Sequence, residues 1–471
     1  MSWHPYDAPL TISNRTFDEV AVGDSASIER TLTLEDIQLF AVMSGDMNPQ
    51  HLDPEFAAST RFHGVIAHGM WGAALISAVL GTRLPGPGTV YLGQTLQFRA
   101  PVRVGDTLVI SVTVLRRDTG RNILTLACTG TNQHGAVVIE GEATVLAPTE
   151  KIERPRATLP EVRLCAGGGQ QRLLERVRPL GRIKMAVVHP CDVLILSGVF
   201  DARAAGLIEP VLVAPRARLE AVAAQAGIDL AGVAIEDVAH SHAAVARSIE
   251  LAAAGMVHAL MKGSLHADEL IGAVRKADPG LRTKRRLSHC FLMQTPAYPR
   301  PFIMTDAVIN IAPTLEEKAD IVRNAIDLAH ATGLAAPHVA ILAAVETINP
   351  AMPATLDAAA LCKMAERGQI IGALLDGPLA FDNAVSIAAA HINGISSPVA
   401  GRADVLVVPD LESGNMLAKQ LEIMSDATTA GIVLGAKVPI VLASRADARG
   451  TRLGSCAIAL LLAHHYRRSP P

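Results

Sequence analysis

Two rhythms of hydrophobic positions divide the chain, and the first occupies residues 1–147. Residues 69–80 (GMWGAALISAVL) are apolar on every face, which is typical of a helix surrounded by other elements. Hydrophobic and polar residues alternate along 108–114 and 137–145, as in strands with one buried face. The stretch 90–100 also alternates and is broken at Gln94. These patterns predict an α+β domain in which an antiparallel sheet wraps around one central helix.

The second rhythm, after residue 165, alternates short apolar runs with longer alanine-rich helical patterns such as 315–332 and 413–424. Strands separated by helices are typical of an α/β domain with a mainly parallel sheet, and the length of this region favours two lobes. The expected strands are 185–189, 210–214, 258–262, 290–294, 302–305, 338–343, 370–375, 405–408 and 439–443.

The boundary between the two rhythms is rich in proline and charge. Pro148, Pro155 and Pro160 stand among charged residues, and proline disfavours helix at the residue before it. We therefore expect a first domain over 1–147, a linker over 148–165 and a second domain over 166–471.

Composition excludes several classes of function. The 471 residues carry 42 Lys+Arg and 45 Asp+Glu, so a large nucleic-acid interface is not expected. Apolar stretches are too short for a membrane span, and the first residues lack a signal-peptide pattern. The six cysteines show no Cys-x-x-Cys spacing, which argues against a thiolate metal site and favours the cytoplasm.

The first candidate site is an acid and a histidine five residues apart. Gly45 and Asn48-Pro49 form turns, so the side chains of Asp46 and His51 can converge after a helix over 34–43. A carboxylate and an imidazole aimed at one water can activate it and return its proton. The same spacing also fits a purely structural loop in which Asp46 is a cap.

The segment 64–70 (GVIAHGM) leads directly into the apolar helix. Free N–H groups at a helix start, together with the positive end of its dipole, can stabilise an oxyanion. Gly69 has no side chain and permits close approach of a ligand carbonyl.

These residues resemble a family. SGDMNPQHLDPEFAASTRFHGVIAHGM, followed by YLGQTLQFRAPVRVGDTL, is similar to the MaoC-like, (R)-specific enoyl-CoA hydratases of the hotdog fold, over residues 10–147. The resemblance implies that Asp46 and His51 add water syn to a trans-2-enoyl-CoA. It also implies that the Gly69 amide polarises the thioester carbonyl, that Asn48 orients the loop and that His68 helps to bind substrate. A thioesterase and a partner-binding hotdog module are the alternatives.

The second candidate site consists of polar clusters at the ends of expected strands. They are Lys262-Gly263-Ser264, Thr305-Asp306 with Asn310, Asp376-Gly377-Pro378, and Ser444-Arg445. Each cluster alone is typical of a turn or helix cap. Because ligands of open α/β sheets bind at strand carboxyl ends, we expect the four clusters to line one edge.

The same segments resemble the phosphate acetyl/butyryltransferases over residues 170–465. The matching text includes VVHPCD at 187–192, MKGSLHADELIGAV at 261–274, IMTDAVINIAPT at 303–314 and VPIVLASRADA at 438–448. The resemblance implies a two-lobed α/β fold and the reaction acyl-CoA + phosphate ⇌ acyl phosphate + CoA. We expect Arg445 to bind phosphate through its guanidinium fork and Ser444 to bind the oxyanion. Lys262, Asp306, Asn310 and Asp376 are expected to bind substrate.

Together the two resemblances predict a bifunctional acyl-CoA enzyme. Its substrates are CoA thioesters and inorganic phosphate, with no tightly bound cofactor, no metal, and neither nucleic acid nor membrane as partner. Both parent families assemble through subunit interfaces, which predicts a homo-oligomer. The rival hypothesis is a hydratase whose C-terminal part is a catalytically weak, CoA-binding scaffold.

Overall fold

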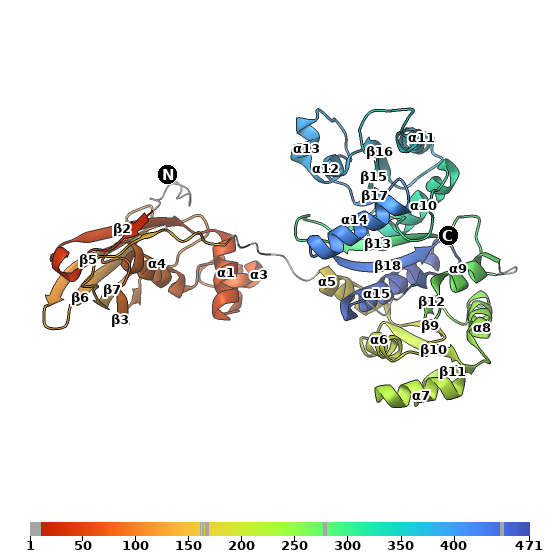
Figure 1. Cartoon of the computed structure of the whole chain (residues 1–471), viewed down its shortest axis with the longest axis horizontal. Helices are drawn as coiled ribbons and strands as arrows, with labels where there is room; N and C mark the ends of the chain where they lie inside the picture. The colour runs from red at the N-terminus through yellow and green to blue at the C-terminus, as the bar shows by residue number, and fades with distance from the viewer. Residues whose placement is uncertain (1–10, 161, 163, 165–168, 277–279, 443–446) are drawn as a thin grey trace. The chain divides into compact units, whose positions relative to one another are not determined.

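The computed structural model describes residues 11–160, 162, 164, 169–276, 280–442 and 447–471. The chain forms two compact units, Met1–Cys165 and Ala166–Pro471 (Figure 1). Within the described residues, none of the helices has the length and apolar character to cross a membrane.

The N-terminal unit is an antiparallel sheet packed on one long helix. The strand order is β2-β5-β6-β7-β3, with β4 pairing β7 as well. Helix α4 (Gly69–Thr82) packs on this sheet, and its Ile76, Val79 and Leu80 are buried against alternate residues of β5 and β6. The predicted hotdog arrangement is thus confirmed. The strands are β2 (Ser25–Thr31), β3 (Val90–Gln94), β4 (Gln97–Phe98), β5 (Thr107–Asp118), β6 (Ile123–Thr131) and β7 (Val137–Leu146).

Helix α4 differs from its prediction on one face. The pattern of 69–80 predicted burial all round, yet the side chain of Met70 is 56% exposed and Ala74 is also exposed. The sheet covers only the side that carries Trp71, Ile76 and Val79, so the opposite apolar side is left uncovered in the single chain.

The N-terminal unit extends past the predicted boundary at residue 147. Strand β8 (Glu153–Pro155) pairs antiparallel with β1 (Thr11–Ser13). The Asn14 amide donates to the Glu150 carbonyl at 2.8 Å, and the Ile152 N–H donates to Asn14 Oδ1 at 2.9 Å. The first half of the predicted linker over 148–165 is therefore part of this unit. Three short helices, α1 (Leu34–Ser44), α2 (Pro49–Leu52) and α3 (Pro54–Ser59), and a 3₁₀ turn (Phe17–Glu19) complete it.

The C-terminal unit contains a continuous eleven-stranded sheet, and most neighbouring pairs are parallel, as predicted. The exceptions are central: β13 is antiparallel to both β14 and β18, and β18 is antiparallel to β19. In sheet order the strands are β11 (Ala234–Asp237), β10 (Ile208–Ala214), β9 (Ile183–Val188), β12 (Ala259–Lys262), β19 (Ile440–Val441), β18 (Thr428–Leu434), β13 (Ser288–Gln294), β14 (Phe302–Thr305), β17 (Val405–Val407), β15 (His338–Leu342) and β16 (Leu374–Leu379).

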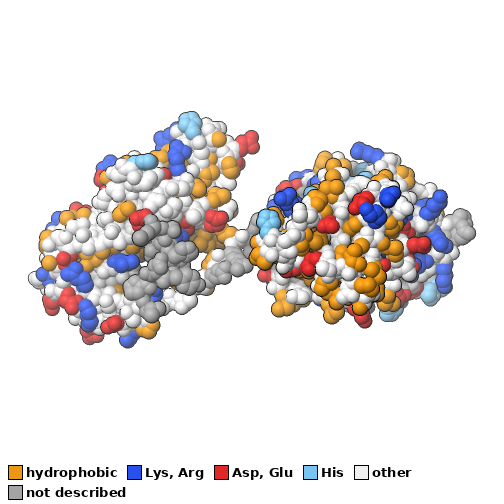
Figure 2. Space-filling view, turned by 90° about the horizontal axis from the view of Figure 1, so that it is seen from above, with side chains coloured by type: hydrophobic (Ala, Val, Ile, Leu, Met, Phe, Trp, Pro, Cys, Tyr) orange, Lys and Arg blue, Asp and Glu red, His pale blue; other side chains and the backbone are white. Residues whose placement is uncertain are grey.

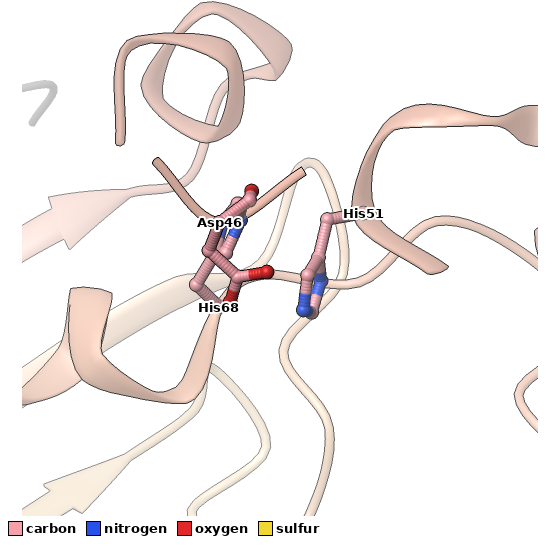
Figure 3. Close-up of side chains that lie close together, drawn as sticks. All are labelled: Asp46, His51 and His68. Carbon is pink, nitrogen blue, oxygen red and sulfur yellow. Dashed lines mark hydrogen bonds between the residues drawn. The ribbon is translucent and has the colours of Figure 1, made fainter. Parts of the chain in front are cut away.

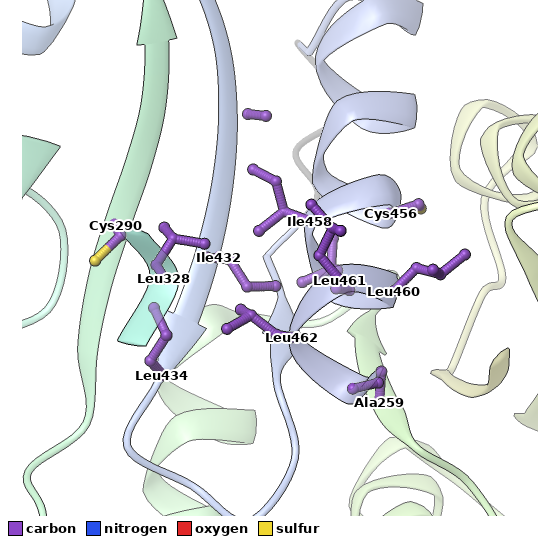
Figure 4. Close-up of a cluster of buried hydrophobic side chains, with 14 of the residues drawn as sticks. Ala259, Cys290, Leu328, Ile432, Leu434, Cys456, Ile458, Leu460, Leu461 and Leu462 are labelled. Atoms are coloured by element: carbon purple, nitrogen blue, oxygen red, sulfur yellow. The ribbon is translucent and has the colours of Figure 1, made fainter. Parts of the chain in front are cut away.

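Helix α15 (Arg449–Tyr466) is the centre of the largest hydrophobic cluster. Its Ile458, Leu461 and Leu462 lie beside Ile432 of β18, as Figure 4 shows. The other helices of this unit are α5 (Gly169–Val177), α6 (Val193–Ala204), α7 (Arg216–Ala226), α8 (Ser241–Ala253), α9 (Ala267–Lys276), α10 (Leu315–Ala331), α11 (Pro353–Glu366), α12 (Phe381–Val385), α13 (Ile387–Ile392) and α14 (Leu411–Met424), with a 3₁₀ turn at Arg178–Leu180.

Three strands of this sheet differ from the sequence prediction. The edge strand β11 was not predicted. Strand β18 was also not predicted, although it occupies the sheet centre between β19 and β13. Strand β16 begins at Leu374 rather than at residue 370, because Ile370 packs in the core after α11 instead of joining the ladder.

The N-terminal core gives a stability prediction. Ile76→Ala should lower the free energy of unfolding of this unit by about 2–5 kcal/mol, because the fully buried side chain leaves a cavity between α4 and the sheet. Guanidinium unfolding followed by tryptophan fluorescence reports this unit, since both tryptophans of the chain precede residue 72. Val42→Ala, at a side chain that is 75% exposed, is the matched control. A shift no larger than that of the control would contradict the packing described.

Candidate functional sites

The loop after α1 presents Asp46. Gly45 ends the helix in the left-handed conformation (φ 74°), and its N–H donates to the Ala41 carbonyl at 2.8 Å. The Asn48 N–H donates to Asp46 Oδ1 at 3.2 Å, while Asn48 Oδ1 caps α2 by accepting from the Gln50 N–H at 3.0 Å. Asn48 therefore joins the acidic residue to the short helix that carries the histidine.

The imidazole of His51 has a defined orientation. Its Nδ1 lies 2.8 Å from the Ile66 carbonyl oxygen. A carbonyl can only accept, so this contact places the imidazole proton on Nδ1. The Nε2 lone pair is then available to accept a proton, which is the state that a general base requires.

The side chain of His68 lies against this loop. It is 3% exposed, and its Nε2 donates to the Asp46 carbonyl at 3.1 Å. Its ring centroid is 3.9 Å from that of His51, with the planes tilted by 33°. Burial is the main cause that lowers the pKa of His68, so its ring stays neutral beside His51. The sequence placed His68 among substrate-binding residues; the structure places it against the two catalytic candidates.

One potential metal-ligand atom from each of Asp46, His51 and His68 lies within 4.8 Å of the corresponding atoms of the other two (Figure 3). Imidazoles bound to one ion radiate outward from it, whereas the rings of His51 and His68 stack on each other. The arrangement therefore suits an acid–base pair better than a metal centre.

Gly69 and a cavity of about 350 Å³ complete this site. Gly69 is the first residue of α4, so its N–H has no acceptor within the helix. A Cβ at this position would lie 3.1 Å from the Phe98 ring, so a side chain here would crowd the cavity wall. The cavity is lined by His51, His68 and Gly69 together with apolar residues such as Val102 and Ile139. An apolar chain can therefore lie beside a proton acceptor and an amide donor.

The second site lies where β9 and β12 end. Lys262 is the last residue of β12, and its Nζ donates to the carbonyls of Gly263 and Leu265 at 3.2 and 3.3 Å. The ladder pairs Met261 with Val441, so β19 leaves the sheet beside Lys262. Ser444 and Arg445 follow β19 in the sequence and lie outside the described residues.

His189 is a candidate that the sequence analysis did not assign. It follows β9, is 5% exposed, and has a positive φ of 55°, which is uncommon for a residue with a side chain. Its carbonyl accepts from the Ser264 N–H at 2.8 Å. The side chains of both residues carry a buried atom with no hydrogen-bond partner in the described structure, His189 Nδ1 and Ser264 Oγ. The motif VVHPCD, at the end of an expected strand, is the sequence feature that could have identified His189.

Asp306 and Asn310 lie in a buried turn after β14. The Asp306 carboxylate accepts from the N–H groups of Val308, Ile309 and Asn310 and from the Asn310 side chain at 2.6 Å. The Asn310 amide also donates to the Leu287 carbonyl at 2.9 Å. Burial raises the pKa of Asp306. Both side chains are thus engaged in holding the turn.

The strand directions contradict the expectation that all four polar clusters lie at one edge of the sheet. Because β13 is antiparallel to β14 and β18, and β18 to β19, strands β14 and β16 run opposite to β12 and β19. Lys262 and the carboxyl end of β19 share one edge, whereas Asp306 follows β14 at the opposite edge. Asp376 lies inside β16 rather than after a strand, and its Oδ1 accepts from the Gly377 N–H at 2.9 Å.

Comparison with known proteins decides the family. Phosphate acetyltransferase from Rhizobium meliloti is 55% identical over 296 residues, covering 63% of this chain and 94% of the relative. The chain belongs to the phosphate acetyl/butyryltransferase family. The family model described as phosphate acetyl/butaryl transferase matches residues 243–460, and the model described as MaoC like domain matches 21–134. These matches support the predicted bifunctional hydratase and phosphotransacylase.

Solved structures are similar to each unit of this family member. A branched-chain phosphotransacylase from Enterococcus faecalis is 29% identical with a TM-score of 0.54, covering 60% of this chain and 99% of the other. The R-hydratase PhaJ1 from Pseudomonas aeruginosa is 45% identical over 33% of this chain and 99% of the other, with a TM-score of 0.32.

The contacts of His68 give a prediction for the MaoC-like domain. His68→Phe keeps a ring beside His51 and removes the hydrogen bond to the Asp46 carbonyl, whereas His68→Gln keeps a donor and removes the ring. Each should lower kcat for crotonyl-CoA hydration by about 10–100-fold, because the acid–base pair loses its alignment. KM should change less than threefold. A large rise in KM with kcat unchanged would instead favour the substrate-binding role predicted from the sequence.

Proposed function

We propose that the N-terminal unit hydrates trans-2-enoyl-CoA to (R)-3-hydroxyacyl-CoA. The observation that carries this proposal is the Asp46–His51 pair, in which the Ile66 carbonyl fixes the proton of His51 on Nδ1. A base nitrogen is thereby available next to a carboxylate, at the mouth of an apolar cavity that begins at Gly69.

The reaction follows from these groups. His51 Nε2 accepts a proton from a water oriented by Asp46, and the water oxygen forms a bond to C3 of the enoyl group. The Gly69 N–H stabilises the enolate oxygen that develops on the thioester. Return of the proton to C2 on the same face completes syn addition and restores the neutral pair. Asn48 contributes by joining the loop that carries Asp46 to the short helix that carries His51.

For the C-terminal unit we propose reversible acyl transfer between CoA and phosphate. A phosphate oxygen attacks the thioester carbonyl, the C–O bond forms, the C–S bond breaks, and CoA leaves as its thiol after gaining a proton. Arg445 would bind phosphate and Ser444 the oxyanion. Lys262, at the edge where β19 leaves the sheet, is placed to add positive charge. Asp306 and Asn310 serve by holding their turn, and Asp376 remains a proposed substrate contact.

The relatives suggest the acyl class. The Rhizobium meliloti relative is named for acetyl transfer, and the Enterococcus faecalis structure is called a branched-chain phosphotransacylase. We propose that short acyl groups are accepted. Each reaction needs only proton transfer and stabilisation of an oxyanion, so we propose that it proceeds without a tightly bound cofactor or a metal ion.

We also propose a cytoplasmic homo-oligomer. The described cysteines Cys128, Cys191, Cys290, Cys362 and Cys456 are all unpaired, as expected in a reducing compartment. Leu92 on the edge strand β3 is 53% exposed, and on α14 Met416, Ile423 and Met424 are each more than 60% exposed. Figure 2 shows hydrophobic side chains gathered on the visible face of the C-terminal unit. Uncovered apolar surface of this kind is typical of subunit interfaces.

Two substitutions separate the two activities. Asp46→Asn should lower crotonyl-CoA hydration by about 10²–10⁴-fold, because the water loses its acid–base partner, and should leave phosphate-dependent CoA release unchanged. Arg445→Ala should do the reverse. Both assays are run on the same purified full-length protein, with chirality of the hydration product determined.

Three experimental outcomes would each contradict a different part of the proposed function. Hydration that persists in Asp46→Asn would remove the proposed hydratase mechanism. A wild-type protein that releases CoA from saturated acyl-CoA without phosphate would be a thioesterase. If the wild type hydrates crotonyl-CoA and shows no phosphate-dependent release, the C-terminal unit would act as a scaffold.

A further inference from the structure

A cavity of about 790 Å³ lies within the C-terminal unit. It is lined mainly by α5, the carboxyl end of β13, the first residues of β14 and β18, and the first turns of α15. This volume is in the range of sites that bind whole small molecules. The cavity is more than twice as large as the cavity at His51 and Gly69.

The wall of this cavity is mainly apolar. Leu173 of α5, Leu292 of β13, Phe302 of β14 and Ala430 of β18 line it, and Phe302 and Ala430 are buried. Such a surface favours a hydrocarbon chain, since each apolar group that leaves water for the wall contributes favourable free energy.

Positively charged side chains also line the cavity. Arg172 and Arg176 lie one turn apart on α5, so both point to the same side of that helix. Neither forms an ion pair with any described residue. The two acidic residues that also line the cavity, Asp404 and Glu422, are paired with Arg300 and Lys419. An apolar interior with unpaired guanidinium groups at its border fits a molecule that has a hydrocarbon part and an anionic part.

Residues that follow the expected transfer motif in the sequence also line the cavity. Ala448 and Thr451, at the start of α15, line it. In the sequence Ala448 stands three residues after Arg445. The hydrocarbon part of a molecule in the cavity can therefore belong to the group that is transferred.

We propose that this cavity receives the acyl chain of the transferase substrate and that the C-terminal unit accepts medium-chain acyl groups. The inference rests on the proposed acyl transfer and adds its chain-length range. An acetyl group would leave nearly all of the volume unfilled. A longer chain gains contact with the wall, and burial of each added methylene corresponds to about a fourfold gain in kcat/KM.

The test compares chain lengths on the full-length protein. Phosphate-dependent CoA release is measured with acetyl-, butyryl-, hexanoyl- and octanoyl-CoA. Wild-type kcat/KM should rise along the series by about fourfold per methylene until the chain fills the cavity. Leu292→Trp and Ala430→Leu, which fill the cavity, should lower octanoyl transfer at least tenfold and keep acetyl transfer within threefold. Leu374→Trp, at an exposed position of β16 outside the cavity, is the matched control and should alter neither.

The outcomes separate the inference from the proposed function. Absence of release with every acyl-CoA would remove the transferase proposal itself. Release with acetyl-CoA and none with octanoyl-CoA would leave that proposal standing and overturn the inference. Filling variants that keep the circular dichroism of the wild type, and that process octanoyl-CoA normally or lose acetyl and octanoyl transfer equally, would also overturn it.

Discussion

The reversal of strand direction at β13 and β18 is the constraint on which the C-terminal unit depends. These two strands pair along their whole length, from Ser288 with Leu434 to Gln294 with Thr428, and they join two groups of parallel strands that run in opposite directions. The carboxyl ends of β9, β12 and β19 therefore lie at one edge and those of β14, β15 and β17 at the other. Helix α15 packs across β18 and stabilises this junction through the largest hydrophobic cluster.

In the N-terminal unit two backbone carbonyl groups determine which nitrogen of two imidazole rings carries the proton. The Ile66 carbonyl accepts from His51 and the Asp46 carbonyl accepts from His68. Because carbonyls only accept, both contacts determine where the imidazole protons reside. Backbone geometry thereby prepares a base without any ion pair, and the buried, neutral His68 adds no positive charge beside it.

The two units share a class of substrate but use different physical means to bind it. The N-terminal site combines a small apolar cavity with a helix N-terminus and an acid–base pair. The C-terminal unit combines strand ends, cationic side chains and a larger apolar cavity beneath α5. A CoA thioester has both an apolar acyl chain and anionic phosphates. The apolar cavities suit the acyl chain, and the cationic side chains suit the phosphates.

The sequence by itself determined the local elements and the first site. Periodicity located α4, β5 and β7, and turn residues around Asp46 and His51 predicted that their side chains converge, because these features depend on neighbours within a few residues. The sequence did not predict that His51 lies on a short helix, α2, instead of on the loop. Only the tertiary structure decided the contacts that join distant segments. Among these are the pairing of β8 with β1, the stacking of His68 on His51, the burial of Asp306 and the reversal at β13 and β18. Such contacts depend on long-range pairing and packing, which local hydrophobic patterns do not specify.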